Sequence, residues 1–229
     1  MSSKRFKKLP QDTFNLPAEL IEKSLNSIKK NCTTKFEESI DLSFQINNKQ
    51  KKSEINIRTV VNLPAGTGKK VKVAVICEET KSSIAKDAGA DIVGSDEFIE
   101  KIKEGKINFD KLICTPSMMI KLSKLGKILG PKGLMPNPKL GTVTDDIQKA
   151  VKDAKSGQVE IRNDKDGNIG VTIGKKSFND ENLMKNYKAI IETLEKGKSN
   201  VSVKGDLIKN VYITSSMGVS YKLKLEKAF

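Results

Sequence analysis

Hydrophobic and polar residues follow two different rhythms along the chain, and these rhythms predict two kinds of structure. Near the N-terminus, helical spacing over residues 17–30 precedes alternation over residues 35–47, which is typical of a half-buried strand. Residues 55–64 alternate again and are expected to pair with that strand as a long antiparallel hairpin. The first part of the chain therefore predicts an α+β structure with antiparallel pairing.

The middle of the chain changes rhythm, because short apolar runs now alternate with helical segments. Strands are expected at 71–77, 89–94 and 109–115, and helices at 81–88, 95–105, 116–128 and 144–156. Strands that alternate with helices of about ten residues indicate βαβ units and a parallel sheet.

The last third returns to the first rhythm. Residues 158–174 are expected to form a hairpin across Asp166-Gly167, followed by an amphipathic helix that stops at Gly197. Two further strands flank residues 216–218. The fold class is therefore mixed, with α+β character at both ends and α/β character in the middle.

One domain interrupted by another is the economical arrangement of these elements. Residues 1–66 and 157–229 would form a discontinuous α+β domain, and residues 67–156 an inserted α/β domain. Two chain crossings at one junction make a plausible hinge. The residues expected to form it are Pro64, Gly66, Gly68 and Gly157.

The charge balance points to a polyanionic partner. The chain has 229 residues and a net charge of +14, more than the magnitude of about 2–8 that solubility asks of a small domain. Nucleic acid is favoured over a membrane, because no basic amphipathic helix with aromatic anchors is visible. No signal peptide or long apolar span is apparent, so a cytoplasmic protein is expected.

Composition also removes much catalytic chemistry. The sequence contains no histidine, which is the commonest general base and metal ligand. The three cysteines, Cys32, Cys77 and Cys114, show no CxxC spacing, so neither a disulfide framework nor a zinc site is indicated. We expect no catalytic residue, no metal and no cofactor.

The segment PAGTGKK, residues 64–70, resembles a phosphate-binding loop only superficially. Lys70 stands where that motif has Ser or Thr, and Leu63 stands where it needs its first glycine. A strand is expected to follow this segment, whereas a phosphate-binding loop is followed by a helix. A nucleotide-dependent α/β enzyme built on the middle domain nevertheless stays open as the alternative function.

The segment GKILGPKGLMPNP, residues 126–138, is too apolar for an ordinary linker and too rich in glycine and proline for a helix or strand. We interpret it as a rigid loop anchored by Leu129, Leu134 and Met135. It would pack against the other domain or face nucleic acid through Lys132 and Lys139.

Extended to residues 124–144, this segment closely resembles the characteristic motif of the ribosomal protein L-one family, in its bacterial form. The likeness continues in VVNLPAGTGKKVKVAV, AGADIVG, FDKLICTPSMM, EIRNDKDGNIGVTIGK and VYITSSMGVSYKL. The resemblance implies a split RNA-binding domain with an inserted Rossmann-like domain.

What the resemblance implies about function is specific. Members bind large-subunit ribosomal RNA and form the mobile stalk near the exit site for deacylated tRNA. Bacterial members can also repress their own operon by binding its mRNA. The implied partners are therefore ribosomal RNA, deacylated tRNA, that mRNA and other ribosomal components, with a monomer off the ribosome. A regulatory RNA binder that never joins ribosomes stays open as a third possibility.

Carried over by position, the family's RNA-binding residues fall in two places, at the start of the first strand and in the last turn. They are Lys35, Phe36, Ser39, Thr214, Ser215, Ser216, Met217 and Gly218. Small residues and hydroxyls let a backbone approach RNA and bond phosphate or the 2′-OH. A plain hairpin turn is the alternative for residues 216–218, and a core position is the alternative for Phe36.

Two cations on the expected hairpin, Arg162 and Lys165, would supply phosphate contacts together with Lys35. Solvated surface charge is the alternative interpretation of all three. The basic N-terminal arm, which includes Arg5, and the lysines at 49–52 are interpreted as nonspecific attraction.

Overall fold

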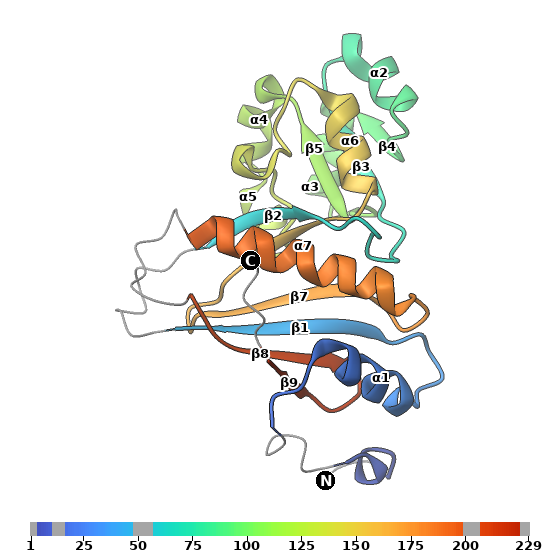
Figure 1. The fold of residues 1–229 in the computed structure, drawn as a ribbon. Helices are drawn as coiled ribbons and strands as arrows, with labels where there is room; N and C mark the ends of the chain where they lie inside the picture. The colour runs from blue at the N-terminus through green and yellow to red at the C-terminus, as the bar shows by residue number, and fades with distance from the viewer. Residues whose placement is uncertain (1–3, 11–16, 48–56, 199–206, 225–229) are drawn as a thin grey trace. The chain divides into compact units, whose positions relative to one another are not determined.

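The computed structural model of the protein describes residues 4–10, 17–47, 57–198 and 207–224, which form two compact units (Figure 1). The terminal unit comprises Met1–Gly68 and Val159–Phe229, and the inserted unit comprises Lys69–Gln158. Both boundaries lie two residues beyond the positions expected from the sequence. The combination of helices with antiparallel and parallel sheets confirms the mixed fold class.

A four-stranded antiparallel sheet with the order β7-β1-β8-β9 forms the body of the terminal unit. Its strands are β1 (Ser39–Ile46), β7 (Asn168–Lys175), β8 (Ile208–Ser215) and β9 (Tyr221–Leu223). Alternation in β1 buries Ile40, Leu42, Phe44 and Ile46 and leaves the residues between them on the other face. The alternation expected over residues 35–47 is therefore correct from Ile40 onward.

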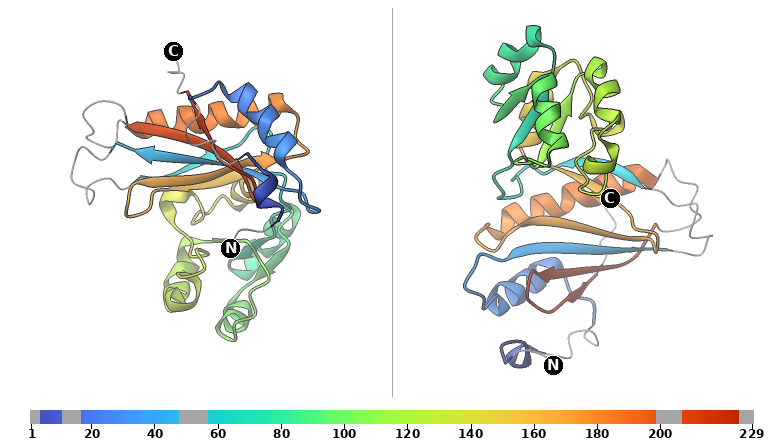
Figure 2. Two further views of the ribbon diagram at one scale, coloured as in Figure 1. Left: turned by 90° about the horizontal axis from the view of Figure 1, so that it is seen from below. Right: turned by 180° about the vertical axis from the view of Figure 1, so that it is seen from behind.

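Two helices, α1 (Ile21–Asn31) and α7 (Asp180–Lys198), lie side by side on one face of this sheet, as Figure 2 shows. Their apolar residues, such as Leu25 and Leu194, join the sheet's buried row in one core. Helix α7 includes Gly197, so the expected stop at that residue is wrong. A short 3-10 helix, η1 (Phe6–Lys8), precedes α1.

The opposite face of the sheet is polar and partly exposed. Its hydroxyls and amides belong to Ser39, Ser43, Gln45, Asn168, Thr172, Asn210, Tyr212 and Thr214. Some are bonded across neighbouring strands: Asn210 Nδ2 donates to Gln45 Oε1 at 2.8 Å, and Thr172 Oγ1 donates to the carboxylate Oδ1 of Asp41 at 2.5 Å. The sheet therefore has one apolar face and one ordered polar face.

Two expected hairpins are wrong in their partners. Strand β2 (Arg58–Asn62) pairs with β6 (Gln158–Arg162) in a separate two-stranded sheet, whereas β1 pairs with β7 and β8. The strands on either side of the Asp166-Gly167 turn therefore belong to different sheets, with only an isolated bridge between Asn163 and Ile169. Alternation shows that a segment is a strand but carries no information about a distant partner.

The inserted unit is built as its rhythm predicts, on a parallel sheet with the order β4-β3-β5. The strands are β3 (Val73–Ile76), β4 (Ile92–Gly94) and β5 (Lys111–Cys114). Helices α3 (Asp96–Lys103), α4 (Pro116–Ser123) and α5 (Gly126–Leu129) share a core with one face of the sheet. Helices α2 (Ser82–Asp87) and α6 (Ile147–Lys155) share a core with the other face.

Helix boundaries in this unit differ from the expected ones in two places. The segment expected as one helix at 116–128 is divided between α4 and α5 at Lys124-Leu125. Helix α6 begins at Ile147 rather than Thr144, because the Asp146 side chain caps it by accepting from Lys149 N. Two 3-10 helices, η4 (Glu79–Lys81) and η5 (Pro138–Leu140), complete the unit.

Candidate nucleic-acid interface

Strand pairing brings together two segments that lie about 180 residues apart in the sequence. Ile40 pairs with Ser215, so the turn between β8 and β9 lies beside the start of β1. Ser216 N donates to Ser39 O at 3.0 Å, and Ser39 N donates to Ser216 Oγ at 3.0 Å. The two family-derived groups of candidate residues thus form one continuous surface, which we call the β1–turn surface: Lys35, Phe36, Ser39, Ser216, Met217 and Gly218.

Two large apolar side chains project from this surface. Phe36 is 55% exposed and Met217 is 49% exposed, although both sit beside a well-packed core. Neither side chain is needed to close that core, so the interpretation of Phe36 as the first core residue of its strand is wrong. An aromatic ring and a methionine presented together offer a stacking and packing surface to a base or a ribose.

A buried carboxylate, Glu38, joins the two segments beneath the surface. Glu38 is 0% exposed, and its Oε1 accepts from Thr34 Oγ1 at 2.9 Å and Thr34 N at 3.3 Å. Its Oε2 accepts from Met217 N at 3.2 Å. Burial raises the pKa of Glu38, but the Ser215 hydroxyl, Thr34 and the Met217 amide outweigh burial and lower it overall. The ionised carboxylate therefore fixes the turn to the loop before β1.

The turn itself is compact, and packing inside the turn explains why residue 218 is a glycine. A Cβ placed on Gly218 would come within 2.3 Å of Ser215 Oγ. Ser215 is only 3% exposed, so its side chain lies inside the turn rather than on the surface. Thr214 is half-buried, and its Oγ1 donates to Ser215 O at 3.1 Å. Ser216, Met217 and Gly218 therefore present the outer part of the turn.

A third segment reaches this surface from the N-terminal arm. Arg5 Nη2 donates to Met217 O at 2.6 Å, and Arg5 Nη1 lies 3.4 Å from Thr33 Oγ1. Its guanidinium therefore bridges the turn and the loop before β1. Sequence reasoning treated this arm as nonspecific attraction, and no motif distinguishes Arg5 from the lysines beside it. Lys35 lies exposed on the same loop.

The other two predicted cations lie elsewhere. Asn168 pairs with Gln45 at the far end of β1, so the turn before β7 is about seven residues, or ~20 Å, from Ser39. Arg162 and Lys165 are exposed at that end. Asp164 holds the turn there by accepting from Asn168 N at 2.7 Å. The terminal unit thus carries cations at both ends of its sheet rather than in one cluster.

The expected hinge residues divide into two groups. Pro64 and Gly66 are held by the terminal unit, where Asn186 accepts from Ala65 N at 3.0 Å and donates to Gly66 O at 2.9 Å. Gly68 packs as closely, since a Cβ there would lie 2.7 Å from the Lys175 side chain. Gly157 has a φ of 102° between α6 and β6. The first chain segment between the units, residues 64–68, is therefore held against the terminal unit as far as Gly68.

The lysine that follows Gly68 does not enter a phosphate-binding loop. Lys69 Nζ pairs with Asp110 Oδ1 at 2.7 Å, and the chain continues into β3 rather than a helix.

All three cysteines are buried, and burial raises the pKa of Cys114 to about 11. Among the described residues, no group of His, Cys, Asp and Glu is arranged to hold a metal ion. No helix in the described ranges is long and apolar enough to cross a membrane.

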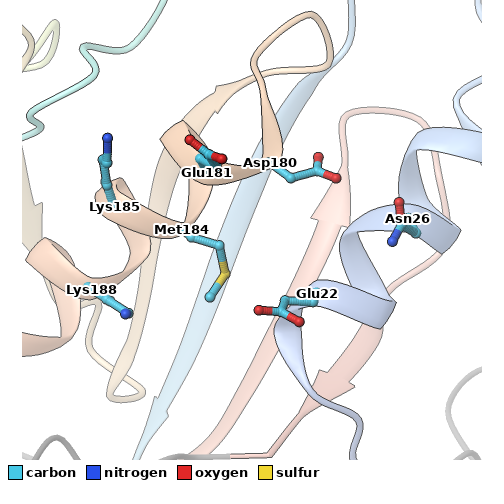
Figure 3. A pocket seen from close by; sticks show the side chains of 7 residues that line it. All are labelled: Glu22, Asn26, Asp180, Glu181, Met184, Lys185 and Lys188. Carbon is cyan, nitrogen blue, oxygen red and sulfur yellow. The ribbon is translucent and has the colours of Figure 1, made fainter.

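A hollow of about 510 Å³ lies between α1 and α7 in the terminal unit (Figure 3). Three carboxylates, Glu22, Asp180 and Glu181, line it together with Asn26, Met184, Lys185 and Lys188. Lys29 Nζ, outside this lining, pairs with Asp180 Oδ1 at 2.5 Å. Figure 3 shows the acidic and basic side chains spread around its rim rather than converging on one point. The hollow therefore lacks the convergent polar groups of a small-molecule site.

The chain is similar to known proteins over most of its length. The model of the Ribosomal protein L1p/L10e family matches residues 28–219. The "Large ribosomal subunit protein uL1" of Pelagibacter ubique (strain HTCC1062) is 75% identical over 228 residues, covering 100% of both chains. The protein of the same name from Rickettsia africae (strain ESF-5) is 49% identical over 88% of this chain and 84% of its own. That of Rickettsia akari (strain Hartford) is 47% identical over 96% and 90%. The chain therefore belongs to the Ribosomal protein L1p/L10e family.

Proposed function

We propose that this chain is a non-enzymatic component of the large ribosomal subunit in the cytoplasm. Its terminal unit binds large-subunit ribosomal RNA through the β1–turn surface and so forms the mobile stalk near the tRNA exit site. There the stalk assists the release of deacylated tRNA. The same surface represses translation of the chain's own operon by binding an mRNA segment that mimics the ribosomal site.

The observation that carries this proposal is the pair of exposed apolar side chains held on a fixed polar frame. Phe36 and Met217 stand at the surface while Glu38 and the Ser39–Ser216 bonds hold their backbones in place. A preorganised surface loses little conformational entropy when it binds. Hydroxyl groups beside an exposed ring suit folded RNA, in which unstacked bases and 2′-hydroxyls are the recognised features.

The polar face of the sheet extends this surface. Its hydroxyls and amides lie in rows that begin at Ser39 and Thr214 and continue toward Asn168 and Asn210. Such groups bond phosphate and ribose without needing a base sequence. The cations at both ends, Arg5 and Lys35 near the turn and Arg162 and Lys165 at the far end, fit an RNA that runs along the sheet.

The net charge of +14 supplies the long-range attraction that this mode of binding needs. The comparisons support the ribosomal assignment, because three relatives named as large-subunit proteins match at 47–75% identity. The alternative, a nucleotide-dependent enzyme, lacks support at the carboxyl ends of β3 and β5. Glu78 and Glu79 follow β3 there, where a dinucleotide fold needs a glycine-rich turn.

Equilibrium binding of a stalk ribosomal RNA fragment tests the proposal. Phe36→Ala should weaken binding by roughly 5- to 150-fold, because stacking of one base on an aromatic ring contributes about 1–3 kcal/mol. Ile84→Ala is the matched control, since Ile84 is 41% exposed but lies on α2 of the inserted unit. Equal affinities for wild type and Phe36→Ala would overturn the assignment of this surface.

Two further measurements separate the alternatives. Cosedimentation of the tagged chain with large subunits distinguishes a ribosomal component from a free regulatory RNA binder, which would stay in the supernatant. Saturable micromolar binding of ATP or GTP by the full chain would favour the enzyme instead.

A further inference from the structure

The inserted unit carries a basic surface of its own, which is distinct from the β1–turn surface of the terminal unit. Between Cys114 and Val143 the chain has five lysines and no acidic residue. Between Glu78 and Lys106, which covers α2 and α3, it has eight carboxylates and five lysines. Charge is therefore separated within one small unit, with its positive part on α4, α5 and the loop that follows.

This positive segment is held rigidly. Helices α4 and α5 pack on the sheet through Met118, Leu122 and Leu129. The loop closes on α5, where Leu134 N donates to Leu129 O at 3.0 Å. Its far end lies along β5, since Cys114 N donates to Thr142 O at 3.0 Å and Thr144 N donates to Cys114 O at 3.1 Å. The glycines and prolines of the loop therefore shape a fixed surface.

Four of the five lysines are available to a partner. Lys121 Nζ pairs with Asp96 at 2.7 Å, so its charge is already matched. The remaining four are exposed, and none forms an ion pair within the described part of the chain. They are Lys124, Lys127, Lys132 and Lys139.

An exposed apolar side chain accompanies these cations. Ile120 on α4 is 76% exposed, more than any other large hydrophobic residue of the described chain. Lys124 follows it by four residues, so the two share one face at the end of α4. An isolated isoleucine among lysines packs against a sugar more readily than it enters a bilayer, because a membrane anchor needs a broad apolar face.

We propose that Ile120, Lys124, Lys127, Lys132 and Lys139, the α4–loop surface, bind the sugar–phosphate backbone of an RNA double helix. Lysine presents a flexible point charge, which suits phosphates without base specificity. The wide minor groove of A-form RNA exposes ribose, against which Ile120 packs. This proposal rests on the proposed function in one respect: the RNA is a second molecule, bound while the terminal unit holds its own.

The test uses the full chain saturated with an unlabelled stalk ribosomal RNA fragment. A fluorescent RNA duplex of about 20 base pairs, unrelated in sequence, is then titrated by anisotropy at about 50 mM salt. The variant is Lys124→Glu, Lys127→Glu and Lys132→Glu together. The matched control is Lys86→Glu, Lys101→Glu and Lys103→Glu, which changes net charge equally but places the changes among the carboxylates of α2 and α3.

The α4–loop variant should lose duplex affinity on the order of a hundredfold, and its salt slope should fall by about 3. The control should lose far less, and the two variants should bind the stalk fragment with the same affinity as each other. Equal losses in variant and control would overturn the proposal, because only general attraction would then be at work. So would a wild-type chain that binds the stalk fragment but no duplex.

Failure of the proposed function gives a different result. In that case the wild type does not bind the stalk fragment, and the titration is repeated on the free protein. A selective loss in the α4–loop variant would then still support this surface. Sedimentation velocity tests whether the surface instead binds a second copy of the chain. That is the case if the wild type self-associates, the α4–loop variant is monomeric and no duplex binds. The RNA proposal is then wrong.

Discussion

Replacing Glu38 by Gln tests whether a buried carboxylate organises the β1–turn surface. Glu38 accepts from Thr34 on one oxygen and from Met217 N on the other. Glutamine keeps one acceptor oxygen, so with that oxygen toward Thr34 its NH2 group faces the Met217 amide, donor against donor. Loss of one hydrogen bond to a charged group costs about 1.5–3 kcal/mol. We therefore expect the terminal unit to be destabilised by about 2 kcal/mol.

Urea unfolding followed by tyrosine fluorescence measures this change in the right unit. The chain has three tyrosines and no tryptophan, and Tyr187, Tyr212 and Tyr221 all lie in the terminal unit. The midpoint should fall while the slope stays constant, as expected for a change in stability alone. Glu37→Gln is the control, because exposed Glu37 accepts from the Ser177 hydroxyl and glutamine can still do so.

The pH dependence gives an independent check. The folded-state pKa of Glu38 lies below its unfolded value of about 4.3 because its hydrogen bonds favour the charged form. A depressed pKa contributes stability that is present above the unfolded pKa and is lost as pH falls through the folded pKa. The stability gap between wild type and Glu38→Gln should therefore be full near neutral pH and shrink below about pH 4.

If Glu38→Gln and Glu37→Gln unfold at the same urea midpoint as the wild type, the carboxylate does not hold the turn. If stability falls but the stalk RNA fragment binds with unchanged affinity, the turn is not part of the interface.

Three further outcomes are expected. Met217→Asp should weaken stalk RNA binding at least tenfold by placing a charge against phosphate, whereas Ile84→Asp should not; unchanged affinity at fixed salt would remove Met217 from the interface. Gly218→Ala should weaken binding because its Cβ meets Ser215 Oγ, and adding Ser215→Ala should restore part of it; no restoration would mean that another contact requires the glycine. Deleting residues 69–158 should leave a folded chain that binds the stalk fragment, as circular dichroism and anisotropy would show; folding without binding would place the interface elsewhere.

Local chemistry made several elements predictable from the sequence. Alternation identified β1, and the strand–helix rhythm of the middle predicted a parallel sheet, whose strand order in the structure is β4-β3-β5. Periodicity is a local property of the chain, so it can be recognised without knowing which strand or helix the segment packs against. Cys77 and Cys114, which lie in apolar runs of the sequence, are both buried. The motif at residues 124–144 then indicated the family, which the comparisons show.

The pairing of strands and contacts between residues far apart in the chain could not be predicted from the sequence. The hairpin of β1 with β2 was wrong because β7 and β8 occupy both edges of β1. Only the folded chain shows Arg5 at the Met217 carbonyl, since no local pattern marks one basic residue of an arm. Glu38 was likewise missed. Alternation places it in the buried row two residues before Ile40, but a carboxylate is seldom buried without a partner, and its partner, the turn at Met217, is distant in the sequence.

The sequence by itself thus determined the class of the strands and the longer helices, the net charge, the absence of histidine and the likeness to a family. The tertiary structure alone decided which elements pair, and therefore which candidate residues share a surface. It placed the turn that carries Met217 beside the segment that carries Phe36, and it put Arg162 and Lys165 at the other end of the sheet. The physical reason is that propensity and periodicity act over a few residues, whereas strand pairing and burial are settled by the whole core.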